Sequence, residues 1–72
     1  MEKIQVTLEK TEDGYWAHSN YISRCISFGH DLDKVKENMN KAVKFHLERL
    51  REDSEPIPHK LEGEYELIFK LD

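Results

Sequence analysis

The fold is decided by the stretch Ser27–Leu32 (Ser-Phe-Gly-His-Asp-Leu), where an extended segment gives way to a helix. Gly29 lets the chain bend, and Asp31 stands where a helix N-cap belongs, because its carboxylate can accept a backbone amide of the first turn. Apolar residues then recur at the 3.6-residue helical period. The face they form consists of Leu32, Val35, Met39, Ala42, Val43, His46 and Leu50. The prolines of Ser54–Pro58 cannot continue a helix, so we expect one helix of roughly five or six turns.

The segments around this helix show the two-residue alternation of strands. They are Lys3–Glu9, Tyr15–Ser19, Arg24–Phe28 and Glu64–Leu71. Asp13-Gly14 between the first two is a strong hairpin signal. The predicted fold is therefore a single α+β domain over residues 1–72 with the order β-β-β-α-β. A right-handed crossover would return the last strand parallel to the first, giving a four-stranded sheet of order 3-2-1-4 with the helix on one face.

One helix covers only one side of such a sheet, so apolar sheet surface is left over. The alternation alone does not decide whether Trp16 or Tyr15, or Phe28 or Ser27, faces the helix. Exposed apolar surface of this kind usually marks an interface. A chain of 72 residues also has a small core, so we expect a homodimer or a higher homo-oligomer.

Phe45 breaks the helical pattern. It falls about 120 degrees from Met39, beside Lys41 and Lys44 rather than in the apolar face. Two interpretations stay open: Phe45 covers a sheet edge, or it is a contact in an assembly. We therefore predict Phe45 and Phe28 as candidate residues of an oligomer interface.

The charges are unevenly distributed along the chain. The formal net charge is −4, and all of it lies in residues 48–66, where seven acidic residues stand against three basic ones. No basic face is present that would follow a phosphate backbone, which argues against nucleic-acid binding by this chain alone. A concentrated acidic segment fits a basic protein partner, although a solvated loop and helix end is the simpler explanation of an isolated charge cluster. Candidate partner-binding residues are Tyr15, Trp16, Glu52, Asp53 and Glu55.

Residues that could support catalysis are few. The four histidines and the single Cys25 lack metal-site spacing, and no nucleophile–base–acid pattern or phosphate-binding glycine loop appears. We expect no metal, no cofactor and no enzyme activity, with His46 in the core or an interface and Cys25 as a small buried hydrophobe. The absence of a membrane-spanning apolar run and of a signal-peptide pattern favours a cytoplasmic protein.

Four blocks of the sequence carry a family resemblance. They are Glu12–Ala17 (EDGYWA), Cys25–Gly29 (CISFG), Ala42–Leu50 and Glu52–Pro58 (EDSEPIP). In this order and at this spacing they resemble the HicB-like antitoxins, in which an Asp-Gly hairpin precedes a Gly-Cys strand end and a helix that closes in Asp-Gly-Glu-x-Ile-Pro. Three residues depart from the pattern: Arg24 stands for a glycine, His30 precedes Asp31, and Ser54 replaces the glycine after the helix.

The resemblance implies a partial ribonuclease-H-like fold and a role as antitoxin of a type II toxin–antitoxin system. Such proteins bind and mask a small, basic HicA-type toxin that cleaves messenger RNA. Many relatives continue into a DNA-binding domain, whereas this sequence stops at Asp72, so direct DNA binding is not expected. Two alternatives remain open. One is a stand-alone structural or regulatory homo-oligomer without a toxin; the other is an RNA-binding or vestigial nuclease module, for which only Glu9 lies on a suitable strand.

Overall fold

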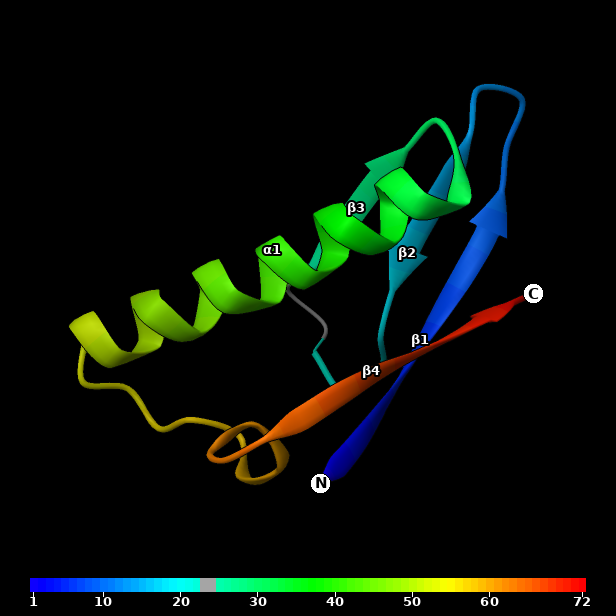
Figure 1. Ribbon diagram of the computed structural model, residues 1–72. Helices are drawn as coiled ribbons and strands as arrows, with labels where there is room; N and C mark the ends of the chain where they lie inside the picture. Colours follow the sequence, from blue (N-terminus) through cyan, green and yellow to red (C-terminus); the bar gives the residue numbers. More distant parts are fainter. Residues whose placement is uncertain (23–24) are drawn as a thin grey trace.

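A computed structural model describes residues 1–22 and 25–72 as a four-stranded sheet covered on one face by a long helix (Figure 1). The strands are β1 (Glu2–Lys10), β2 (Tyr15–His18), β3 (Ile26–Gly29) and β4 (Tyr65–Leu71). The helix α1 (Leu32–Glu52) connects β3 to β4 through a loop that contains a short 3₁₀ helix, η1 (His59–Leu61). The sequence pattern did not predict η1.

The sheet order is β3-β2-β1-β4, which confirms the predicted topology. β1 pairs antiparallel with β2, and β2 pairs antiparallel with β3. β4 pairs parallel with β1 over seven residues, from Glu2 opposite Tyr65 to Leu8 opposite Leu71. The expected start of the third strand at Arg24 lies outside the described residues.

Both ends of α1 are capped by local chemistry. The carboxylate of Asp31 accepts a hydrogen bond from the backbone amide of Lys34 at 2.8 Å, as the sequence predicted. At the other end, the amide of Glu55 donates to the carbonyl of Leu50 at 2.8 Å, and the amide of Ser54 donates to that of Arg51 at 3.2 Å. This pair of bonds is a Schellman motif, which needs a residue in the left-handed conformation just after the helix. Ser54 takes that conformation, with φ of 54°.

The core lies between α1 and the sheet. Its buried residues are Ile4, Val6, Leu8, Ala17, Ile22, Cys25, Val35, Met39, Val43, Leu47, Leu61 and Leu67. Leu47 was missing from the predicted apolar face, whereas Ala42 and His46 are only half-buried. The helix comes very close to β3 at Gly29, where a Cβ would lie 2.3 Å from the backbone nitrogen of Val35. Glycine is therefore required there by the approach of two backbones.

The structure settles which strand residues face the helix. Ala17 and Ser27 are buried beneath α1, and Tyr15 is half-buried on the same side. Since side chains alternate along a strand, Trp16, Ile26 and Phe28 lie on the opposite face, which no described segment covers.

Candidate functional site

The residues predicted to bind a partner fall into two separate groups. Trp16 lies on the open face of the sheet, close to the strand end from which the chain enters α1. Glu52, Asp53 and Glu55 lie at the far end of that helix, which at 21 residues is about 30 Å long. The β1–β2 turn and the end of α1 stand at opposite ends of the molecule, whose longest dimension is 39 Å (Figure 1). One small docking surface therefore cannot contain both groups.

The group at the end of α1 surrounds Phe45, which was predicted as an oligomer contact and whose side chain is 64% exposed. The ring therefore does not cover a sheet edge, which was one of the two interpretations of its position. A hollow of about 310 Å³ on the outer side of α1 is lined by Phe45, Glu48, Arg49, Glu52 and Asp53. We call Phe45, Glu48, Glu52, Asp53 and Glu55 the acidic helix end.

The carboxylates of the acidic helix end point to solvent. Among the described residues, no basic side chain lies within ion-pair distance of Glu48, Glu52 or Asp53. Elsewhere on the same helix, Glu37 is paired with Lys41 at 3.1 Å and with Lys34 at 3.7 Å, and these lysines lower the pKa of its carboxyl. The acidic helix end thus presents an exposed aromatic ring beside carboxylates that are available to a partner.

The group around Trp16 is the open-face patch, which consists of Trp16, Ile26 and Phe28. The rings of Trp16 and Phe28 pack edge to face with centroids 5.1 Å apart. Trp16 is 44% exposed and Ile26 is 60% exposed. His30 adds a second edge-to-face contact to Phe28, with centroids 5.4 Å apart. Phe28, predicted as an oligomer contact, therefore belongs to this patch and not to the surface around Phe45.

Tyr15 belongs to neither group. It is half-buried on the helix side of β2, and the ammonium of Lys10 lies 5.1 Å from the centre of its ring. This position favours a structural role for Tyr15 over the partner-binding role that was predicted with Trp16. Of that pair, only Trp16 is accessible from the open face.

The histidines and the cysteine form no common site. His18 approaches the carboxylate of Glu9 at 3.4 Å, and a ring nitrogen of His30 lies 3.1 Å from the carbonyl oxygen of Asp13. Cys25 is buried, and burial raises the pKa of its thiol. Within residues 1–22 and 25–72, no three metal-ligating side chains come together.

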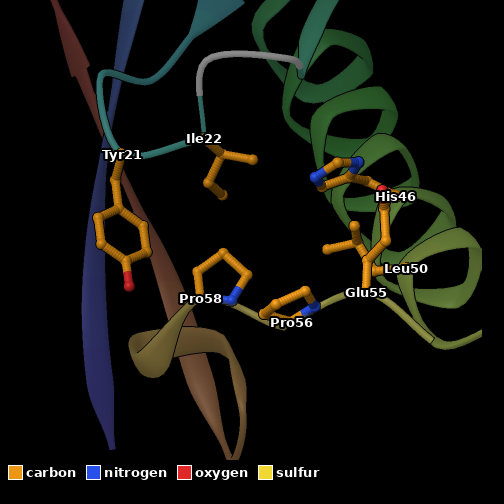
Figure 2. A pocket seen from close by; sticks show the side chains of 7 residues that line it. All are labelled: Tyr21, Ile22, His46, Leu50, Glu55, Pro56 and Pro58. Carbon is orange, nitrogen blue, oxygen red and sulfur yellow. The ribbon is translucent and has the colours of Figure 1, made fainter. Parts of the chain in front are cut away.

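A hollow of about 310 Å³ lies between the C-terminal half of α1 and the proline loop (Figure 2). His46 and Leu50 line it from the helix, and Tyr21, Ile22, Glu55, Pro56 and Pro58 line it from the loops. The hydroxyl of Tyr21 accepts a hydrogen bond from the backbone amide of Lys60 at 2.9 Å, so this side chain links η1 to the segment that follows β2. The lining contains polar and apolar surface in similar amounts and is open to solvent. His46 therefore borders this hollow instead of sitting in the sealed core.

Sequence comparison finds a related phage protein. The chain is 34% identical over 53 residues to an "uncharacterized 14.9 kDa protein in rep-hol intergenic region" of Haemophilus phage HP1 (strain HP1c1). The alignment covers 74% of this chain but only 40% of the phage protein, so the chain spans less than half of that relative. No protein-family profile and no solved structure matches the chain. In the part of the chain that the structure describes, no helix has the length and apolar character needed to cross a membrane.

Proposed function

We propose that this chain is a HicB-like antitoxin of a type II toxin–antitoxin pair, and that it masks a small, basic, mRNA-cleaving HicA-type toxin. The ordered motifs of the sequence support the family, and the four-stranded sheet of order 3-2-1-4 with one helix is compatible with the partial ribonuclease-H-like fold that the family implies. The acidic helix end supports the kind of partner. Because such a toxin acts on messenger RNA, the proposal places the chain in the cytoplasm and gives it no enzyme activity of its own.

The observation that carries the proposal is the exposed ring of Phe45 beside Glu48, Glu52 and Asp53. Aromatic anchors commonly supply much of the binding energy of an interface, whereas charges around the rim accelerate association and orient the partner. A basic protein with an apolar recess would satisfy both features. A second copy of this chain would not, because its own carboxylates would be repelled.

The proposal is tested by stopped-flow association with a HicA-type toxin at physiological salt, where charges interact over about 8 Å. The double variant Glu48→Lys and Glu52→Lys should slow association by about tenfold and reduce its dependence on salt. The matched control is Glu62→Lys with Glu64→Lys, which changes the net charge equally but lies beyond the hollow around Phe45. Circular dichroism establishes that each variant keeps its helix.

A third variant separates the anchor from the charges. Phe45→Ala should leave the association rate nearly unchanged and speed dissociation by ten- to a hundredfold, as expected for loss of an aromatic contact. Relief of toxin inhibition should follow in an RNA-cleavage assay. Equal association rates for the two double variants, or inhibition unchanged by Phe45→Ala, would show that the toxin does not dock here.

A second candidate function is a stand-alone structural or regulatory homo-oligomer without a toxin. The observation that favours it is the open-face patch, which is apolar and lies away from the acidic helix end. Self-association through this patch would leave the acidic helix end free, so an oligomer alone does not decide between the two functions. They are separated by whether the chain alone suppresses the activity of a HicA-type toxin.

A further inference from the structure

The two edge strands of the sheet differ in chemistry. β4 carries Glu66 and Lys70 on the open face, and charged residues of this kind protect an edge from pairing with another chain. β3 consists of Ile-Ser-Phe-Gly, without charge. Within the described residues, β3 has a strand neighbour only on the side of β2. This edge therefore has backbone groups suitable for pairing and none of the charged protection that β4 has.

Three apolar side chains of the open face lie at this same edge. Ile26 and Phe28 are on β3 itself, and Trp16 lies directly opposite Phe28 on β2. The next residues across the open face, on β1, are the polar Thr7 and Glu9. The open-face patch is thus confined to the β3 side of the sheet, where a neighbouring strand would extend it.

We propose that β3 pairs antiparallel with β3 of a second copy, around a twofold axis that passes beside Ser27. In an antiparallel pair, residues directly opposite each other point to the same face. A register centred on Ser27 therefore sets Ile26 of each copy against Phe28 of the other, both on the open face. It uses only the backbone of residues 26–28, which β3 already holds in strand geometry.

This register joins the two open-face patches into one. Following the sheet across the axis, Trp16 and Phe28 of one copy meet Ile26 and then His18 of the other, because His18 is opposite Ile26 within each copy. The most exposed apolar side chain of β3, Ile26, is then covered by an aromatic ring. Self-association of this kind removes apolar surface from water without bringing two acidic helix ends together.

Asn38 already contacts this edge, but it does not block the pairing. Its side-chain amide donates to the carbonyl oxygen of Phe28 at 2.7 Å. A carbonyl oxygen has a second lone pair, so it can also accept the amide of Ile26 from the other copy. A strand of four residues nevertheless buries less than the roughly 800 Å² per partner of a standard interface. We therefore expect a dimer with a dissociation constant in the micromolar range.

The test is sedimentation equilibrium of the whole chain over about 1–300 μM, which brackets a micromolar constant. We expect a species of twice the 8.6 kDa chain mass. Ile26→Lys should weaken dimerisation at least a hundredfold, because it places a charge against Phe28 of the other copy. The matched control is Leu71→Lys on β4, since Leu71 is 58% exposed and Ile26 60%. That variant should change the constant less than threefold.

A second measurement examines the register directly. Amide hydrogen exchange at Ile26 and Phe28 should slow as the protein concentration rises, while exchange at the β4 edge should not change. A chain that stays monomeric up to about 300 μM, or an Ile26→Lys variant that dimerises like the wild type, would overturn the proposal. Equal loss of dimer in the two lysine variants, or protection confined to β4, would overturn it as well. None of these results depends on whether a toxin exists.

Discussion

Replacing Ser54 by glycine should stabilise the protein, because Ser54 is the residue that holds the left-handed conformation at the end of α1. Its φ of 54° places the Cβ close to its own backbone, which costs a non-glycine residue about 1–2 kcal/mol. Glycine removes this strain, but it also loosens the unfolded chain, which offsets about 0.4–1 kcal/mol. The net expected gain in the free energy of unfolding is about 0.5–1 kcal/mol. For a domain of 72 residues this corresponds to a rise in Tm of about 3–6 °C.

The assay is urea unfolding followed by circular dichroism, with Ser54→Ala as the matched control. Alanine removes the same hydroxyl but keeps the Cβ, so it should leave the stability of the wild type nearly unchanged. The reasoning is refuted if the glycine variant is no more stable than the alanine variant. A gain of equal size in both variants would instead assign the effect to the hydroxyl.

Three further predictions concern the core. Gly29→Ala should destabilise the protein by about 1–3 kcal/mol or more, because the new methyl group meets the backbone of Val35. Chemical unfolding measures this loss, and an unchanged stability would contradict the close approach of helix and strand. Met39→Ala should cost about 2–5 kcal/mol, because Met39 is fully buried between helix and sheet, and a loss below 1 kcal/mol would mean that the core can collapse around the cavity. Burial raises the pKa of Cys25 above its ordinary value of 9.0, so the thiol favours the folded state at neutral pH and this contribution is lost as the pH rises above about 9. The free energy of unfolding should therefore fall more between pH 7 and pH 10 in the wild type than in Cys25→Ala. An equal fall in both proteins would contradict this role of the thiol.

The sequence was sufficient to predict the order of the elements and the sheet topology. Alternation identifies each strand, the spacing from Leu32 to Leu50 identifies the helix, and handedness fixes the return of β4 beside β1. The N-cap at Asp31 could also be predicted, because a carboxylate in that position accepts a backbone amide of the first helical turn. These features depend on local chemistry and on a rule of connection, and both are visible in a single chain.

Features that depend on packing could not be predicted from the sequence. Nothing in the alternation of β2 says whether Trp16 or Tyr15 meets the helix, because both are aromatic and the choice is made by the registers of β1 and β3. Leu47 was not included in the predicted apolar face of the helix, because its burial depends on how α1 crosses the sheet. The spatial arrangement of the candidate site residues was out of reach for the same reason. Trp16 and the acidic segment were both predicted to bind a partner, and the length of α1 puts them at opposite ends of the molecule.

The most direct test of the central claim, that the acidic helix end binds a basic toxin, is hydrogen exchange with and without an equimolar HicA-type toxin. Mass spectrometry of the peptides resolves the helix from the sheet, and the toxin lacking its nuclease activity is sufficient. We predict that protection increases over Lys44–Glu55, around Phe45, and does not change across the open face at Trp16. Increased protection across β2 and β3 with none at the end of α1, or no protection at any peptide, would contradict the claim.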